Sequence, residues 1–106
     1  MLARALPCFG GSPVVMAHFG GYMFWDRAIP AYRGTPAYVD TSYSHSRVIL
    51  PLALGLIEAL GCDHVLYGSD APWSDPAREA ALINSLPLTA GEKDMILYQN
   101  AERLLA

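Results

Sequence analysis

The sequence predicts an α/β fold in which parallel strands alternate with helices, as in part of a (β/α)8 barrel. Three short apolar runs, 14–17, 37–39 and 64–67, have the character of buried strands, because none of them alternates apolar with polar residues. Each run is followed by a polar or glycine-rich loop and then by a helical pattern. This alternation implies parallel strands joined by right-handed crossovers, and the spacing of roughly 25 residues suits one β/α unit of a barrel.

The chain is too short for a closed barrel. It has 106 residues and three β/α units, whereas a closed barrel of this kind typically takes about 250 residues. Hydrophobic residues make up 53% and charged residues 16% of the chain, which is typical of a slice of a larger core and excludes disorder. We therefore predict an incomplete barrel whose outer strands, near 13–18 and 64–68, are unpaired on their outer sides.

The first half of the chain is predicted to contain a short helix, two strands and a longer helix. Residues 1–9 are expected to end a helix that Gly10 and Gly11 stop. A strand near 13–18 and a second near 37–40 follow. The clearest helix is expected over 47–60, because apolar residues recur there every four positions and Gly61 follows.

After the third strand, near 64–68, the capping residues predict three more helices. Asp75 suits the N-cap of the first, with proline at the next position. Thr89 and Glu92 fit a capping box that opens the second. Asn100 is expected to cap a last short helix through Leu105.

Charge and cysteine content exclude several classes of partner. The net charge is −3 and no basic cluster is present, which argues against nucleic acid. No apolar run approaches the roughly 20 residues that span a bilayer, so no membrane partner is expected. Cys8 and Cys62 form neither a CxxC motif nor a disulfide framework, and Arg4 and Pro7 interrupt the start of the chain. A cytoplasmic location without a signal peptide is therefore expected.

Polar residues follow all three expected strands. His18 follows the first strand, Asp40 ends the second, and Asp70 follows the third. Chemistry in barrel enzymes sits at the carboxyl ends of the strands, so His18 and Asp70 can converge there. Taken alone, His18 could instead be a hydrogen-bonded core histidine and Asp70 a turn cap. Capping is the favoured interpretation for Asp40.

Several other side chains near these loops are weaker candidates. Trp73, Trp25 and Tyr22 could wall a substrate pocket, although packing between loops and helices is the favoured interpretation for each. His45 lies in the loop after the second strand, where a solvated histidine is favoured over one that reaches a substrate.

Four strings in order give the chain a family resemblance: AHFGG, YVDTS, VLYGSDAPW and EKDMILYQNAERLL. Together they resemble the C-terminal portion of the amidohydrolase-related (amidohydrolase 2) family of metal-dependent hydrolases and decarboxylases. The resemblance implies that residues 1–106 are the C-terminal part of one TIM-barrel domain, comprising its last three β/α units. It also implies a divalent metal, above all zinc, as cofactor and a small molecule as substrate.

In that family the metal is bound by an HxH pair on the first strand, a histidine on the fifth and an aspartate on the eighth. A further histidine on the sixth strand contacts the water, the substrate or a second metal. By motif, His18 matches the sixth-strand histidine and Asp70 the eighth-strand aspartate, so both are expected as catalytic residues and metal ligands. The HxH pair and the fifth-strand histidine are absent from the chain, because His64 lies at the wrong end of its strand.

The resemblance thus implies a C-terminal fragment of a hydrolase. A metal-activated water would attack a C–N or C–O bond, or the related reaction would be a C–C decarboxylation. Asp70 would take the proton of that water, and His18 would orient the water or polarise the substrate.

Two alternatives stay open. The chain could be a truncated, catalytically inactive barrel fragment that acts only through association with another chain, either as a homo-oligomer or with a missing N-terminal barrel portion. A serine hydrolase built from Ser69, His18 and an aspartate carries little weight, because Ser69 lacks a G-x-S-x-G elbow. Ser69 and Asp70 are also adjacent, so in extended backbone they would point to opposite sides.

Overall fold

The computed structural model describes residues 2–44 and 47–106, and it contains a three-stranded parallel sheet with helices around it. The elements in chain order are α1 (Leu2–Ala5), the 3-10 helix η1 (Leu6–Phe9), β1 (Val15–Met16), the 3-10 helix η2 (His18–Gly20), α2 (Trp25–Tyr32), β2 (Tyr38–Asp40), α3 (Leu50–Leu60), the 3-10 helix η3 (Cys62–His64), β3 (Val65–Leu66), α4 (Pro76–Ser85), α5 (Ala90–Asp94), the π-helical segment η4 (Met95–Gln99) and α6 (Asn100–Leu105).

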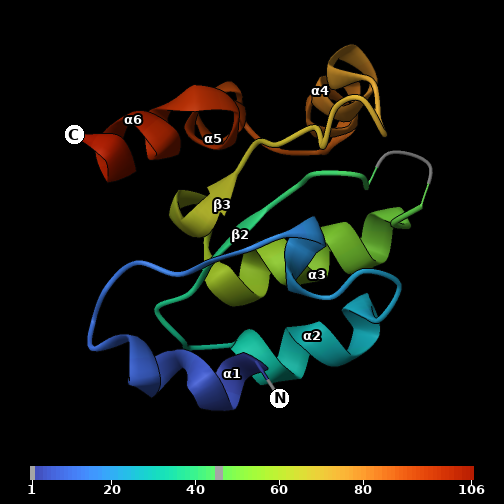
Figure 1. Ribbon diagram of the computed structural model, residues 1–106. Helices are drawn as coiled ribbons and strands as arrows, with labels where there is room; N and C mark the ends of the chain where they lie inside the picture. The colour runs from blue at the N-terminus through green and yellow to red at the C-terminus, as the bar shows by residue number, and fades with distance from the viewer. Residues whose placement is uncertain (1, 45–46) are drawn as a thin grey trace.

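The sheet has the predicted parallel order. Strand β1 pairs with β2, with Val15 opposite Tyr38, and β2 pairs with β3, with Asp40 opposite Leu66. The strands have only two, three and two residues, so they are shorter than expected. Figure 1 shows α1, α2 and α3 on one side of the strands and α4, α5 and α6 on the other. Because all three strands are parallel, their carboxyl ends meet at one edge of the sheet.

Most of the predicted helix ends are confirmed. Helix α3 begins at Leu50, three residues later than expected, and Gly61 follows it at a φ of 91°. The Asp75 carboxylate accepts a hydrogen bond from the Ala77 N–H at 2.9 Å and caps α4. The capping box at Thr89 is present with both of its hydrogen bonds. These signals succeed because a cap bonds to backbone only a few residues away.

The predicted cap at Asn100 is wrong. Gln99 and Asn100 both have helical backbone angles, and α5, η4 and α6 follow one another without interruption. The Asn100 side chain is fully buried, and its Nδ2 donates to the carbonyls of Cys62 at 2.6 Å and Val65 at 2.8 Å. Asparagine is common at caps, but here it serves a contact with the start of β3, 35 residues away.

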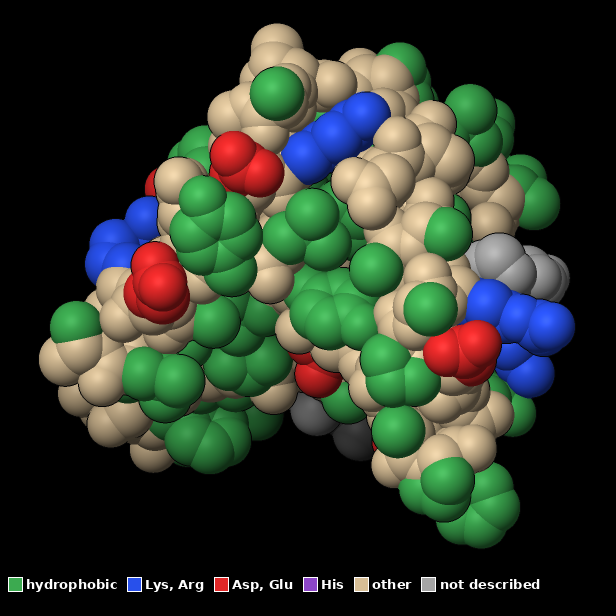
Figure 2. All heavy atoms as spheres, turned by 90° about the horizontal axis from the view of Figure 1, so that it is seen from above, with side chains coloured by type: hydrophobic (Ala, Val, Ile, Leu, Met, Phe, Trp, Pro, Cys, Tyr) green, Lys and Arg blue, Asp and Glu red, His purple; other side chains and the backbone are tan. Residues whose placement is uncertain are grey.

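The buried side chains form one hydrophobic cluster, and its largest fully buried apolar members are Phe19, Leu56, Ile83, Leu86, Ile96, Val39 and Val65. Strand β1 departs from the expected two-sided burial, since Val15 remains 42% exposed at the sheet edge. The face viewed in Figure 2 carries hydrophobic side chains among scattered charges. No helix within 2–44 and 47–106 is long and apolar enough to cross a bilayer.

Candidate active site at the carboxyl edge of the sheet

The loops that leave the three strands at the carboxyl edge share an unusual backbone. His18, Tyr43 and Asp70 follow β1, β2 and β3, and they have φ values of 58°, 54° and 61°. Phe19 continues the pattern with a φ of 52°. Residues with a Cβ rarely adopt positive φ, and such conformations concentrate at functional sites because the surrounding structure must hold them. The shared backbone therefore marks this edge as the candidate site.

His18 is half-buried and is held by the loop after β2. Its backbone N–H donates to Asp40 Oδ1 at 3.1 Å. Its Nδ1 lies 2.9 Å from the Ser42 carbonyl oxygen and 3.1 Å from Ser42 Oγ. The carbonyl of His18 accepts a 2.7 Å hydrogen bond from Trp25 Nε1. Nε2 has no hydrogen-bond partner among the described residues, so it is the ring nitrogen available for chemistry.

Two tyrosine rings flank the imidazole of His18. The centroid of Tyr22 lies 5.7 Å away and that of Tyr43 6.1 Å away, both in edge-on geometry. The two tyrosine centroids are themselves 5.7 Å apart. The Arg47 guanidinium lies 3.9 Å from the centroid of Tyr43. The His18 ring therefore has aromatic side chains beside it, and a cation lies close to the ring of Tyr43.

The predicted aromatic residues occupy different places. Tyr22 lies beside His18 and is 42% exposed, so it can line a pocket. Trp25 is 3% exposed and its Nε1 donates to the His18 carbonyl, which confirms the packing interpretation for this residue. Trp73 is 75% exposed and packs little. His45, the other predicted loop histidine, lies outside the described residues.

Asp40 joins the loops after β1 and β2. Its Oδ1 accepts the N–H groups of His18 at 3.1 Å and Ser42 at 3.0 Å, and it also accepts the Ser42 hydroxyl. The bond from Ser42 N–H is the loop cap that the sequence predicted for Asp40. The bonds to His18 and to the Ser42 hydroxyl were not predicted, because they link segments 22 residues apart and depend on strand pairing.

Asp70 lies at the same edge in the loop after β3. It is exposed, and its carbonyl accepts the N–H groups of Trp73 at 2.9 Å and Ser74 at 3.3 Å. Strands β1 and β3 are both neighbours of β2, so the bases of the His18 and Asp70 loops are about 10 Å apart at the usual strand spacing. That the two side chains share one space stays a prediction.

Ser69 contributes to the turn that carries Asp70. Its Oγ accepts the Ala71 N–H at 3.4 Å. No contact joins Ser69 to His18 among the described residues, so the structure gives the serine hydrolase interpretation no support.

Glu79 is a buried carboxylate that the sequence reasoning missed. It is fully buried on α4, and Oε2 accepts the Ser44 N–H at 3.1 Å while Oε1 accepts the Ser74 hydroxyl at 2.5 Å. Glu79 thus ties α4 to the loops after β2 and β3. In the sequence, Glu79 looks like an ordinary acidic residue in the first turn of a helix. Its burial depends on loops that pack over α4, so the sequence alone does not reveal it.

The donor types at this edge suit a divalent metal, but the set is incomplete. Imidazole nitrogen and carboxylate oxygen are common ligands of zinc, and a catalytic zinc normally has three protein ligands. Among the described residues, no group of three or more His, Cys, Asp and Glu side chains could hold a metal ion. The described residues therefore do not by themselves form a three-ligand site of this kind.

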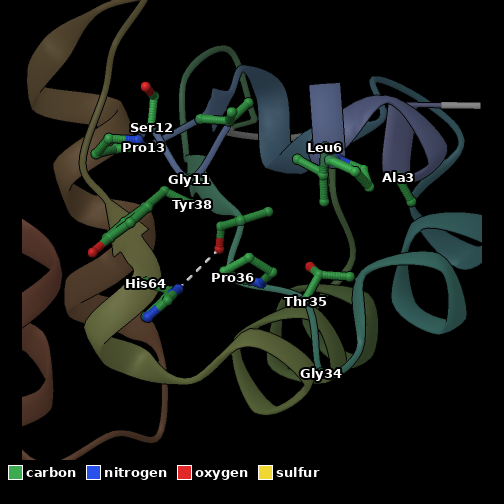
Figure 3. Close-up of a pocket in the computed structure, with 13 residues that line it drawn as sticks. Ala3, Leu6, Gly11, Ser12, Pro13, Gly34, Thr35, Pro36, Tyr38 and His64 are labelled. Carbon is green, nitrogen blue, oxygen red and sulfur yellow. Dashed lines mark hydrogen bonds between the residues drawn. The ribbon is translucent and has the colours of Figure 1, made fainter. Parts of the chain in front are cut away.

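The opposite edge of the sheet carries His64 and a cavity of about 600 Å³. The His64 ring stacks on Tyr38 at 4.4 Å, and its Nδ1 lies 3.0 Å from the Ala37 carbonyl oxygen (Figure 3). The cavity is lined by residues that precede the strands, including Pro13 and Pro36. His64 is therefore remote from His18, as expected from its position at the amino end of β3.

The comparisons with known proteins agree on family and fold. The sequence model of the family described as Amidohydrolase matches residues 1–106. No curated protein sequence matches the chain. Solved structures similar to it include 5-carboxyvanillate decarboxylase from Sphingomonas paucimobilis, at a TM-score of 0.74 and 21% identity over 97% of this chain and 38% of that one.

Two further structures carry metals in their descriptions. A dihydroxybenzoic acid decarboxylase from Polaromonas, with bound manganese and an inhibitor, has a TM-score of 0.67 and 16% identity over 87% of this chain and 33% of its own. An amidohydrolase from Burkholderia multivorans with bound zinc has a TM-score of 0.67 and 18% identity over 96% of this chain and 49% of its own. At these identities the likeness shows the fold alone, a section of a TIM barrel. The chain spans a third to a half of the length of these structures.

Proposed function

The chain belongs to the amidohydrolase family, and from this premise we propose that it supplies His18 and Asp70 to the active site of a metal-dependent hydrolase or decarboxylase. One observation carries the proposal. His18 is held through Nδ1 at the carboxyl edge of the sheet, with Nε2 left for chemistry. Asp70 follows β3 at the same edge, on a backbone of the same strained type.

The residues would divide the chemistry as follows. A divalent metal, zinc or manganese, would lower the pKa of a bound water. The exposed carboxylate of Asp70 can accept a proton from an attacking water and return it to a leaving group. Nε2 of His18 can bind or orient the water or the substrate, and the rings of Tyr22 and Tyr43 would form one wall around a small-molecule substrate.

We also propose that residues 1–106 are the C-terminal part of one TIM-barrel domain. The three parallel β/α units and the 33–49% of each similar structure that the chain spans support this. The remaining metal ligands would then come from outside the described residues, either from an N-terminal barrel portion or from another chain. The same barrel portion or chain would also bury Val15, which is exposed on the edge strand β1.

Metal titration of the chain tests the two ligands. Calorimetry with zinc and with manganese is run on the unchanged chain, His18→Ala, Asp70→Asn and the double variant, with the exposed Asp26→Asn as the matched control. Because two ligands leave an ion mostly hydrated, we expect weak binding and no turnover of an ester or a carboxylated phenol. Each single variant should weaken binding, and the two effects should be non-additive because one ion bridges both side chains.

Additive effects, or an equal loss in Asp26→Asn, would contradict a shared ion. Tight stoichiometric zinc binding with turnover that Asp70→Asn abolishes would show that the chain holds a complete site. Turnover that resists chelators and is abolished by Ser69→Ala would instead support the serine hydrolase.

A non-enzymatic function is the second candidate: a catalytically inactive barrel fragment that acts through association with another chain. The absence of a three-residue metal group from the described residues favours it. It predicts that His18→Ala and Asp70→Asn leave metal binding and association unchanged, which the same titration and a sedimentation measurement separate from the first proposal.

A further inference from the structure

We propose that Asp40 and Ser42 are positioning residues that fix His18 as its Nδ1–H tautomer, so that Nε2 presents a lone pair to the reaction. The inference rests on the proposed function in giving His18 a part in the site. Its evidence is the set of contacts around the His18 ring and backbone.

The tautomer follows from the partners of Nδ1. The Ser42 carbonyl oxygen lies 2.9 Å from Nδ1, and a carbonyl oxygen can only accept a hydrogen bond. Nδ1 must therefore carry the proton. A neutral imidazole has one N–H, so Nε2 is then unprotonated. Free histidine in water favours the Nε2–H form, which means that the fold selects the less common tautomer here.

Asp40 makes the Ser42 hydroxyl a second acceptor for the ring. The hydroxyl has one proton, and it donates that proton to Asp40 Oδ1. Ser42 Oγ then turns a lone pair towards Nδ1, which lies 3.1 Å away. A hydrogen bond to a carboxylate is stronger than one between neutral groups, so Asp40 holds the hydroxyl in this orientation. Both oxygens of Ser42 consequently accept from the same Nδ1–H.

Asp40 also holds the backbone that carries the ring. His18 has a φ of 58°, a conformation that costs free energy for a residue with a Cβ. Its N–H donates to Asp40 Oδ1 and its carbonyl accepts from Trp25 Nε1, so both ends of the strained residue are tied down. The ring is thereby oriented from the backbone and from Nδ1 together.

This arrangement decides what His18 can do. With Nδ1 committed as a donor, neutral His18 acts at Nε2 as a base or as a metal ligand. It can donate from Nε2 to a substrate carbonyl only after a proton has been added there. A role in which neutral His18 polarises a carbonyl, one of the options that the family resemblance raises, is therefore disfavoured by these contacts.

Nitrogen-15 NMR of the histidine-labelled chain tests the proposal without any need for turnover. At about pH 8.5, two units above the ordinary histidine pKa, the shifts of the two ring nitrogens report which one is protonated. His64 is an internal control, because its Nδ1 lies 3.0 Å from the Ala37 carbonyl at the opposite edge and should also carry the proton. The variants are Asp40→Asn, Ser42→Ala and Ser42→Thr, with the exposed Ser12→Ala as matched control.

We expect the Nδ1–H form for His18 in the unchanged chain, in Ser12→Ala and in Ser42→Thr, which keeps a hydroxyl. Asp40→Asn and Ser42→Ala should raise the Nε2–H fraction of His18 severalfold and leave His64 unchanged. An Nε2–H form in the unchanged chain, or no change in both variants, would overturn the proposal. If Asp40→Asn also changes the tautomer fraction of His64, the fold has been lost in that variant. The Ser42 variants then decide, and equal His18 tautomer fractions in Ser42→Ala and Ser42→Thr would overturn the proposal.

Failure of this test is distinguishable from failure of the proposed function. The tautomer is measured on the ring itself with no metal or substrate present, whereas the proposed function is tested by metal binding and turnover. If His18 is the Nδ1–H tautomer but His18→Ala leaves metal binding unchanged, the proposed catalytic role of His18 fails, whereas the proposal that Asp40 and Ser42 position its ring stands.

Discussion

Replacing Asn100 should destabilise the chain through the loss of two buried hydrogen bonds. The side chain is fully buried, and Nδ2 donates to the carbonyls of Cys62 at 2.6 Å and Val65 at 2.8 Å. In Asn100→Ala the Val65 carbonyl loses its side-chain donor, at about 1–3 kcal/mol for a buried group. The Cys62 carbonyl keeps the Val65 N–H as a donor, so the second lost hydrogen bond costs only about 0.5–1.5 kcal/mol. The Asn100 Oδ1 atom is buried without a hydrogen-bond partner among the described residues, and its removal returns an amount similar to that lost at the Val65 carbonyl. The net loss should be about 0.5–1.5 kcal/mol.

Urea unfolding followed by circular dichroism measures this loss, as a lower midpoint with an unchanged slope. Asn84→Ala on the exposed side of α4 is the matched control and should change the free energy of unfolding by less than about 0.5 kcal/mol. Asn100→Asp should be worse than Asn100→Ala at neutral pH, because it points a carboxylate at two carbonyl oxygens, and part of the loss should return in acid as the carboxyl protonates. Equal free energies for Asn100→Ala and Asn84→Ala would refute the reasoning.

Three further outcomes follow from the same structure. Burial, followed by the hydrogen bond to Glu92, raises the pKa of the Cys62 thiol to about 11. Alkylation at pH 8 should therefore modify the exposed Cys8 first, and Cys62 should become reactive only as the pH approaches 11. Equal alkylation rates for the two cysteines in a mass-spectrometric time course would contradict this. Gly20→Ala should destabilise the chain by about 1–3 kcal/mol in urea unfolding, because Gly20 has a φ of 77° and an added Cβ would lie 2.8 Å from the Tyr32 ring. A change in the free energy of unfolding below about 0.5 kcal/mol would contradict that contact. The isolated chain should elute from size exclusion as an oligomer or aggregate, because the outer edge of β1 pairs with no other described strand, and a stable, cooperative monomer would count against the incomplete barrel. The outer side of β3 differs from the expected open edge, since the Tyr67 N–H donates to the Ile96 carbonyl and the Val65 carbonyl accepts from Asn100.

The parts of the fold that the sequence predicts correctly are local or periodic. The caps at Asp75 and Thr89 bond to backbone two or three residues away, so the sequence contains both partners side by side. The parallel order of the strands follows from the alternation of apolar runs with helices. The lengths of the strands could not be predicted in this way, because the backbone leaves the ladder early at positive-φ residues such as His18.

The candidate site is predicted in position but not in detail. Strand-end placement singles out His18 and Asp70, since parallel strands bring their carboxyl ends to one edge. The contacts of Ser42 with the His18 ring join residues 24 apart and exist only once β1 and β2 are paired. For the same reason Glu79 was missed and Asn100 was wrongly predicted as a helix cap. Each has an ordinary local role in sequence, and each is buried by a segment that lies more than 30 residues away.

The short strands make the site depend on the register of the sheet. Beyond the last ladder positions, side chains replace backbone as acceptors: Asp40 Oδ1 accepts the His18 N–H, and Thr41 Oγ1 accepts the Gly68 N–H at 3.2 Å. Gly68 approaches so closely that an added Cβ would lie 3.2 Å from the Cβ of Ser42. A slip of one residue between neighbouring strands would reverse which face each side chain occupies. Asp40 would then point away from His18, so the pairing of the strands also sets the geometry of the candidate site.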